Sequence, residues 1–226
     1  MKRIIEIKGA EGGTDSKLFA KDLANAYIKQ FNRVGWLTRT IADSEFGVTI
    51  EVEGKDLHKL NNEAGGHRIQ RVPPTERKGR VHTSTVTVAV IDPDKKIDSI
   101  YSQRNDSDFK FEWYSGTGKG GQNRNKIQAC SRITHIPTGI ISTAQTRSRE
   151  SSKTQAMASM IEKLDALELN AIQKESGNNK KEQVGSGMRG DKIRTYMDQH
   201  GIVKDHRTEK SASFNKIMSG NFDLLW

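Results

Sequence analysis

The glycine-rich run at residues 116–122, Gly-Thr-Gly-Lys-Gly-Gly-Gln, is the segment whose residue types and spacing could best do chemistry. Its glycines give the backbone conformations that are closed to residues with a Cβ atom. A phosphate-binding loop is one interpretation, but the Gly-x-x-x-x-Gly-Lys-Ser/Thr pattern is missing. The apolar strand before the run and the helix after it that a dinucleotide site needs are missing too. A plain hairpin tip is the other interpretation, because glycine-rich tips are common in turns.

The side chains near this run offer little conventional catalysis. Cys130 and His135 are the residues here that could be proposed as a nucleophile or a base, and the simpler interpretation of His135 is a strand residue whose ring makes hydrogen bonds. A single cysteine cannot form an internal disulfide, which is consistent with a reducing compartment. No histidine or cysteine spacing is typical of a metal site, so we predict neither a metal nor another cofactor.

An excess of positive charge indicates the class of partner. The chain has 37 Lys plus Arg against 28 Asp plus Glu, a formal net charge of +9, which favours nucleic acid over a merely soluble basic protein. Residues 110–153 hold eight basic and two acidic side chains, so this segment is predicted to face phosphates and to bind less tightly as salt rises. No apolar stretch approaches about 20 residues, so we expect no membrane partner.

The elements that must position these residues are those of an α+β protein. Helical spacing of apolar residues predicts helices at about 18–31 and 153–174, the second ending near Gly177. Apolar residues that alternate with polar ones predict strands at about 5–7 and 86–90, and further strands are predicted around 133 and 140.

Two polar or glycine-rich runs, 102–108 and 185–187, are candidate joints between domains. We therefore predict a first domain at 1–104, a second at 105–186, and a C-terminal segment at 187–226. The chain ends Phe222-Asp223-Leu224-Leu225-Trp226, and an apolar end of this kind is expected to dock on the first domain.

The sequence around the glycine run resembles a known family. Gly120-Gly121-Gln122 is followed at residues 132–140 by Arg-Ile-Thr-His-Ile-Pro-Thr-Gly-Ile. This combination resembles the catalytic domain of class I peptide chain release factors of the bacterial, organellar and phage type. The resemblance implies translation termination, with an α/β catalytic domain inserted into a codon-recognition domain that is built from the N-terminal half and the C-terminal tail.

The resemblance implies a role for the tripeptide. Water attack on the peptidyl-tRNA ester creates a developing oxyanion, for which a fixed backbone N–H is a good donor. Gly120 and Gly121 would let the loop enter a narrow RNA-lined site, and the N–H of Gln122 would donate. The side chain of Gln122 would position or select water and would carry N5-methylation. The protein would then complete a ribosomal site rather than act as a stand-alone enzyme.

Residues 65–76 and 79–84 resemble the family's codon-reading region, of the kind that reads UAA and UAG. The resemblance implies that Thr75, in the loop Pro73-Pro74-Thr75, contacts the early bases. His82 would stack between the second and third bases. Without the family, this loop is simply a rigid turn and His82 a lone histidine.

Two further groups of residues complete the implied codon reader. Gln70 and Thr83 would read the third base and accept either purine. Gly12, Gly13 and Asp15, at the start of the first helix, would discriminate the first uridine. These contacts are of the kind by which proteins read single-stranded RNA, through base edges and stacking.

The implied partners are the ribosome, through its 16S-type and 23S-type rRNA, the mRNA stop codon, the P-site peptidyl-tRNA and a glutamine N5-methyltransferase. We expect a monomer in the cytoplasm, in an organellar matrix or in the cytoplasm of a phage-infected bacterium.

Three departures from the family pattern keep a second function open. We expect the usual N-terminal helical domain to be missing, because the resemblance starts within the first ten residues. Asn123 stands where the family often has His, and residues 197–200 differ from the usual pattern. These features favour a ribosome rescue factor, whereas Thr75 and His82 favour a stop-codon decoder. A non-catalytic RNA-binding module is the third hypothesis.

Overall fold

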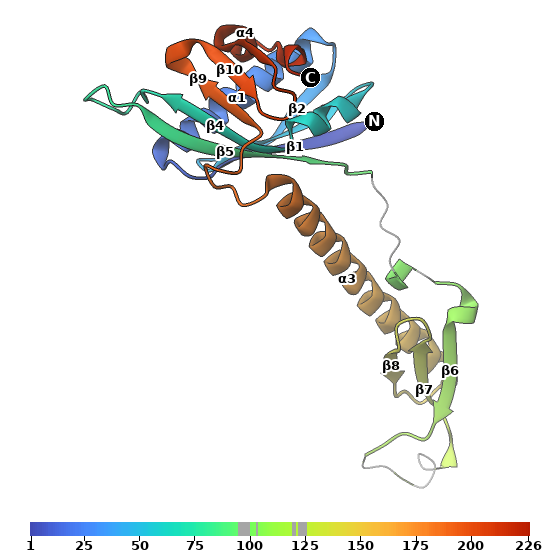
Figure 1. Ribbon diagram of the computed structural model, residues 1–226. Helices are drawn as coiled ribbons and strands as arrows, with labels where there is room; N and C mark the ends of the chain where they lie inside the picture. Colours follow the sequence, from blue (N-terminus) through green and yellow to red (C-terminus); the bar gives the residue numbers. More distant parts are fainter. Residues whose placement is uncertain (95–99, 103, 119–120, 122–125) are drawn as a thin grey trace. The chain divides into compact units, whose positions relative to one another are not determined.

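The protein, described here by a computed structural model, is built from two compact units (Figure 1). The structure describes residues 1–94, 100–102, 104–118, 121 and 126–226. The first unit contains Met1–Lys95 and Ser176–Trp226, and the second, Lys96–Glu175, is inserted between them in the sequence. The predicted α+β class is confirmed. The unit boundaries fall before the joints that the sequence suggested at 102–108 and 185–187.

The first unit is organised by an eight-stranded sheet with the order β11-β10-β9-β4-β5-β1-β3-β2. Neighbouring strands are antiparallel except β4 and β9, which run parallel. The C-terminal strands thus extend the sheet formed by the N-terminal half. The strands are β1 Lys2–Gly9, β2 Leu37–Asp43, β3 Gly47–Glu53, β4 Gly65–Arg71, β5 His82–Ile91, β9 Arg194–Met197, β10 Ile202–Asp205 and β11 Ser211–Ser213.

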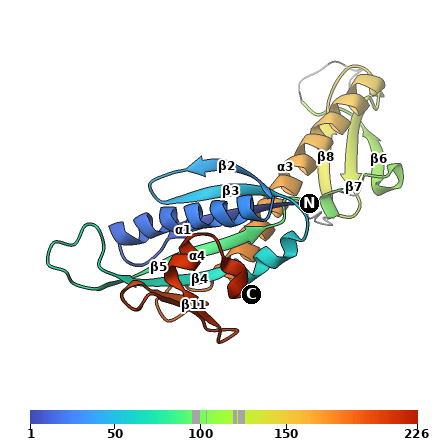
Figure 2. The ribbon, with the colours of Figure 1, turned by 90° about the horizontal axis from the view of Figure 1, so that it is seen from above.

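One face of this sheet is covered by the helix α1, Thr14–Arg33 (Figure 2). The apolar residues at helical spacing, Phe19, Leu23, Tyr27 and Phe31, are fully buried against the strands. The 3₁₀ helix η1, Leu57–Glu63, adds Leu57 and Leu60 to the same core.

The end of the chain also lies in this core. The short helices α4, Phe214–Met218, and η5, Phe222–Leu224, carry the buried residues Ile217 and Phe222, and Leu225 is fully buried as well. The Phe222 backbone N–H donates to the side chain of Gln30 on α1 at 3.0 Å.

The second unit is a small antiparallel sheet, β6-β7-β8, packed against the first part of the helix α3, Arg149–Val184. Its strands are β6 Phe109–Tyr114, β7 Cys130–His135 and β8 Ile140–Ala144, preceded by the short helices η2 Ile100–Ser102 and η3 Asp106–Asp108. The core consists of Phe109, Ile133, Ala144, Ala156, Met160 and Leu164.

The helix α3 is longer at its C-terminal end than the sequence predicted. The expected end near Gly177 is wrong, because the polar residues that follow continue the helix to Val184. Two of these residues, which belong to the first unit, contact its strands: Lys180 pairs with Glu6 on β1 at 3.0 Å, and the Gln183 amide bonds both backbone groups of Val90 on β5 at 2.8 and 2.9 Å. These contacts offset the poor helix propensity of the segment, and Gly185, at φ 63°, then ends the helix.

Candidate functional site

The hairpin of β4 and β5 brings three predicted site residues, Gln70, His82 and Thr83, together. Gln70 lies directly opposite Thr83, and Arg71 lies opposite His82, at the ends of the two strands. Residues directly opposite each other share a face of the sheet, so Gln70 and Thr83 form an adjacent pair. Both side chains are partly exposed, which leaves their donors and acceptors open to a ligand.

The loop between these strands presents Thr75. Pro73 is buried, whereas Pro74 and Thr75 are exposed at the end of the hairpin. The Glu76 N–H donates to the Pro73 carbonyl at 3.0 Å, which closes a turn around Pro74 and Thr75. The exposed threonine is therefore carried on a rigid turn rather than on a loose tip.

Glu76, which the sequence did not single out, organises the rest of this loop. Its carboxylate accepts hydrogen bonds from the Lys78 backbone N–H at 2.7 Å, from the Arg80 guanidinium at 3.0 and 3.1 Å, and from the His82 Nε2 at 2.8 Å. The Lys78 N–H and the Arg80 side chain lower the pKa of Glu76 to about 2. The carboxylate is thus ionised at neutral pH and orients the exposed His82 ring.

The start of α1 is attached to the same hairpin through Asp15. The Asp15 side chain is 3% exposed and accepts hydrogen bonds from the Arg71 Nε at 2.9 Å and from the Ser84 hydroxyl at 2.7 Å, and its carboxylate forms an ion pair with the Arg71 guanidinium at 2.8 Å. Arg71 also binds Asp22, about two turns further along the same face of α1, at 2.8 Å. The carboxylate of Asp15 therefore faces the hairpin. The backbone groups at the start of the helix are the ones left to contact a ligand.

Gly12 allows this close approach. Its φ of 122° is closed to most residues, and a Cβ there would lie 2.4 Å from the Ser84 Oγ and 2.8 Å from the Ser84 Cα. A Cβ added at Gly13, where φ is 60°, would meet no atom within 4 Å. All the predicted codon-reading residues thus gather at one end of the first unit, around the hairpin and the start of α1.

The second candidate site lies on the loop between β6 and β7. The strands end at the pair Tyr114 and Cys130, so the loop projects from the end of a hairpin. Gly121 is exposed, and a Cβ built on it would meet no atom within 4 Å. Gly120 and Gln122 lie outside the described residues, as does Asn123.

Two basic side chains of α3 lie over aromatic rings of β6. Lys153 lies over Phe111 at 4.9 Å and Arg149 over Trp113 at 5.4 Å, measured from the cationic atom to the ring centroid. Arg149 also donates to the Gln128 carbonyl at 2.8 Å, which ties the returning loop to the start of α3. These contacts hold the base of the loop and place positive charge beside it.

The two side chains that could serve as a conventional nucleophile or base are buried in the fold. Cys130 is buried in β7. His135 is fully buried, its Nδ1 is 2.8 Å from the Thr138 Oγ1, and its ring packs on Phe109 with centroids 5.1 Å apart. Neither side chain is presented to a substrate in this arrangement.

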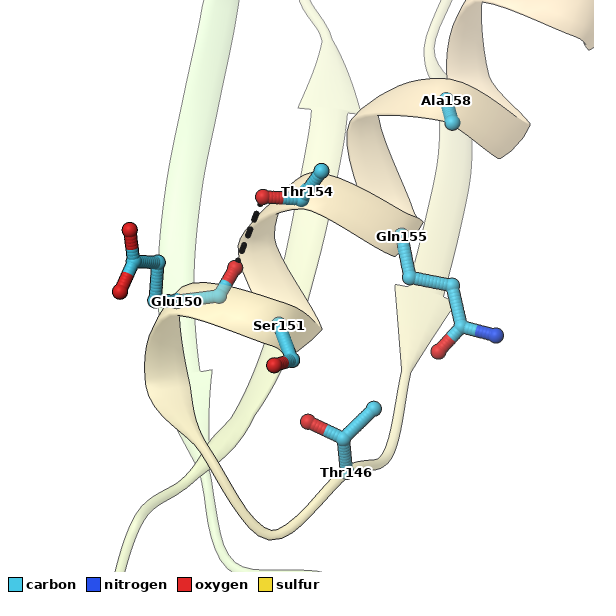
Figure 3. A pocket seen from close by; sticks show the side chains of 6 residues that line it. All are labelled: Thr146, Glu150, Ser151, Thr154, Gln155 and Ala158. Carbon is cyan, nitrogen blue, oxygen red and sulfur yellow. Dashed lines mark hydrogen bonds between the residues drawn. The ribbon is translucent and has the colours of Figure 1, made fainter.

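A pocket of about 470 Å³ opens beside the first turns of α3 (Figure 3). Two of its hydroxyls are used within the protein: the Thr154 Oγ1 donates to the Glu150 carbonyl at 3.0 Å, and the Thr146 Oγ1 donates to the Ser148 carbonyl at 2.7 Å. The pocket is lined by Thr146, Glu150, Ser151, Thr154, Gln155 and Ala158.

Within the described part of the chain, no cluster of three or more His, Cys, Asp or Glu is arranged to hold a metal ion. No helix there is both long enough and apolar enough to cross a membrane.

Two domain families match the chain. Residues 1–88 match the PCRF domain, and residues 96–207 match the RF-1 domain. The domain boundary between these matches coincides with the start of the second compact unit at residue 96.

Curated relatives match over almost the whole chain. Peptide chain release factor 1 of Nitrosomonas europaea is 38% identical over 98% of this chain and 64% of its own length. Those of Borrelia hermsii and Acetivibrio thermocellus are 39% identical, again over 98% of this chain and over 64% and 63% of their own. The chain thus spans a little under two thirds of these relatives.

A solved structure is similar as well. The structure of RF2 of Thermus thermophilus matches all of this chain and 66% of its own, with 29% sequence identity and a TM-score of 0.54.

Proposed function

The chain belongs to the class I peptide chain release factors, and we propose from this that it promotes hydrolysis of peptidyl-tRNA on ribosomes that hold UAA or UAG. The observation that carries the proposal is the gathering of Gln70, Thr75, His82 and Thr83 at one end of the first unit. In this proposal the first unit is the codon-recognition domain, and the second is an inserted catalytic domain.

The geometry of the hairpin end suits the reading of unpaired bases. Gln70 and Thr83 stand side by side with an amide and a hydroxyl, groups that can both donate and accept hydrogen bonds. Such a pair can accept either adenine or guanine at the third position, because it can present a donor or an acceptor to each. The exposed His82 ring, held by Glu76, offers a flat surface for stacking.

The first base would be recognised by the start of α1. The Asp15 carboxylate is used by Arg71 and Ser84, so the backbone groups of Gly12 and Gly13 would provide the contacts. Unpaired backbone N–H groups at a helix start are donors that suit the carbonyl-rich edge of uracil. Asp15 would act as a positioning residue that fixes this helix end on the hairpin.

The chemical step would depend on the loop that carries Gly120, Gly121 and Gln122. The open space around Gly121 is compatible with a slender tip that enters a narrow site. The backbone N–H of Gln122 would stabilise developing negative charge, and the Gln122 side chain, proposed as the methylated residue, would position water. The peptidyl-tRNA, the rRNA of both subunits and a glutamine N5-methyltransferase are the proposed partners.

Peptide release from ribosomes programmed with UAA, UAG, UGA or a sense codon tests the proposal. We expect release on UAA and UAG, with a loss of about 100-fold for Gln122→Ala, because misplacing a reacting group costs about this factor. Thr75→Ala should lower release on both stop codons. Gln128→Ala in the same loop and Thr40→Ala on β2, both exposed, are matched controls that should leave the rates unchanged.

Two outcomes would contradict the proposal in different ways. Equal release on all four codons, insensitive to Thr75→Ala but lost with Gln122→Ala, would indicate a rescue factor for stalled or damaged ribosomes. The unusual segment Asp198–His200, which forms the 3₁₀ helix η4 after β9, is the described feature that favours this alternative. Release that is unaffected by Gln122→Ala would reject the catalytic role of the loop.

A further inference from the structure

The sheet face away from α1 carries a row of polar and basic side chains in register. Arg68 on β4 lies opposite Thr85 on β5 and beside Thr195 on β9, and Thr195 pairs with Lys204 on β10. His67 and Ile69, the neighbours of Arg68, are fully buried on the α1 side, so Arg68 points to the opposite face. None of these residues belongs to the sites described above.

Arg68 is a partly buried cation without an acidic partner among the described residues. Its Nε is buried and has no hydrogen-bond partner, and the guanidinium donates once, from NH2 to the Thr195 Oγ1 at 3.2 Å. Among the described residues no carboxylate pairs with Arg68, and burial alone lowers its pKa. A partly buried charge of this kind is costly unless an anion accompanies it.

Thr195 connects Arg68 to the neighbouring His206. Thr195, 2% exposed, accepts from Arg68, so its hydroxyl hydrogen is available for the His206 Nε2 at 2.8 Å. This chain of bonds assigns the remaining proton of a neutral His206 to its Nδ1. Burial, followed by the charges of Lys192, Arg68 and Lys204, lowers the pKa of His206, and the charge of Glu209 opposes this shift.

Lys192 completes the cluster. Its neighbour Ile193 joins the two sides of the site, because the Ile193 N–H donates to the Gly66 carbonyl on β4 and its own carbonyl accepts from the His206 N–H, each at 2.8 Å. Lys192 forms no ion pair with any described residue, whereas Lys204 is paired with Glu209 at 2.6 Å. The cluster therefore presents several donors, and none of the described carboxylates is paired with Arg68 or Lys192, a pattern that suits a phosphate group.

We propose that Arg68, Lys192 and His206, with Thr195 orienting Arg68 and His206, form a binding site for a phosphodiester group of a single RNA strand. Gln70 follows Arg68 by two residues on the same face of β4, so the site lies about 7 Å along the strand from the pair Gln70 and Thr83. An RNA strand whose base meets that pair would have a neighbouring phosphate within reach of the cluster. The claim that the site lies beside a base-reading pair rests on the proposed function. The claim that the cluster binds a phosphate group does not.

Binding of the full chain to a fluorescein-labelled oligouridine 12-mer, followed by anisotropy at several salt concentrations, tests the proposal without a stop codon or a ribosome. Each phosphate neutralised on a single strand contributes about −0.7 to the slope of log K against log salt, which corresponds to about five-fold in affinity at about 0.1 M salt. We expect Arg68→Gln and Lys192→Gln each to bind the oligouridine about five-fold more weakly and to have a slope smaller by about 0.7. Lys29→Gln, which removes an exposed charge from α1 on the other side of the sheet, is the matched control.

Arg68→Lys distinguishes the loss of the charge from misfolding. It keeps the charge, so it should keep the slope of log K against log salt. Unchanged slopes in Arg68→Gln and Lys192→Gln would overturn the proposal, and so would an equal loss in Lys29→Gln. Since the probe has no stop codon, these outcomes are independent of the release assay. A chain that released peptides without codon preference could still bind RNA at this cluster.

Discussion

At the scale of single residues, the structure separates side chains that can touch a ligand from those that hold them. His82 and Thr75 are exposed, whereas Asp15 is buried and fully used by Arg71 and Ser84. Sequence alone suggested all three as contact residues, because types and spacing do not show where a side chain points. Only the folded contacts with Arg71 on β4 and Ser84 on β5 reveal that the Asp15 carboxylate faces inward.

Glu76 provides a prediction at this scale. Glu76→Ala removes the acceptor that holds both Arg80 and His82, so the His82 ring loses its orientation. We expect kcat/KM for release on UAA and UAG to fall about ten-fold, the usual effect of losing a hydrogen bond to a charged group. Steady-state release with the separate measurement of kcat and KM checks this.

The conservative variant distinguishes positioning from a structural role. Glu76→Gln keeps a side-chain oxygen for the Lys78 N–H and should recover part of the lost kcat/KM. Glu45→Gln, on an exposed residue paired with Lys17, should leave release unchanged. Full activity of Glu76→Ala would mean that His82 needs no support.

At the scale of elements, the sequence predicted those with a clear period and missed those that depend on distant partners. Alternating apolar residues identified β5, and helical spacing identified α1. The last turns of α3 were missed because their residues are polar and include Gly177. Their stabilising contacts, from Lys180 to Glu6 and from Gln183 to Val90, join residues that are far apart in the sequence.

The contact between the start of α1 and β5 is testable through Gly12. Gly12→Ala would place a Cβ 2.4 Å from the Ser84 Oγ and strain a backbone with φ 122°. We expect the free energy of unfolding to fall by about 3 kcal/mol, from backbone strain and overpacking together. Gly35→Ala, at φ 77° with no atom within 4 Å of the new Cβ, should cost only about 1 kcal/mol. Urea unfolding measures both, and equal losses would show that the close approach to Ser84 is not a constraint.

At the scale of the whole molecule, a buried polar network joins the two sequence segments of the first unit. Arg194 on β9 binds Glu63 from the N-terminal segment and Asp205 on β10, and Trp226 at the chain end also donates to Glu63. His67 bonds the Glu63 carbonyl through Nε2 at 2.9 Å. The sequence showed these charged residues but not that they are fully buried, because burial of ion pairs depends on the long-range pairing of β4 with β9.

This network predicts the response of the first unit to acid. Burial and then the charge of Arg194 lower the pKa of His67 from 6.5 to about 4. Burial alone would raise the pKa of Asp205, but hydrogen bonds from Arg207 and Arg194 outweigh it and lower that pKa to about 2. Both groups have folded pKa values below their unfolded ones, so their stabilisation is present at high pH and is lost as pH falls. His67 acts first, between pH 6.5 and about 4, and Asp205 only below about pH 4.

Urea unfolding from pH 8 to pH 4 measures this effect. In a Trp113→Phe background, the remaining tryptophans, Trp36 and Trp226, both report on the first unit. We expect the free energy of unfolding to fall by about 3 kcal/mol between pH 6.5 and pH 4, because the unfolded state binds a proton that buried His67 does not. His67→Gln should be less stable at pH 8 yet show a flatter profile, whereas His58→Gln, on an exposed histidine of η1, should keep the parental slope. A profile equally steep in His67→Gln would place the acid sensitivity elsewhere, and the joining of the two segments would then not depend on a neutral histidine in the core.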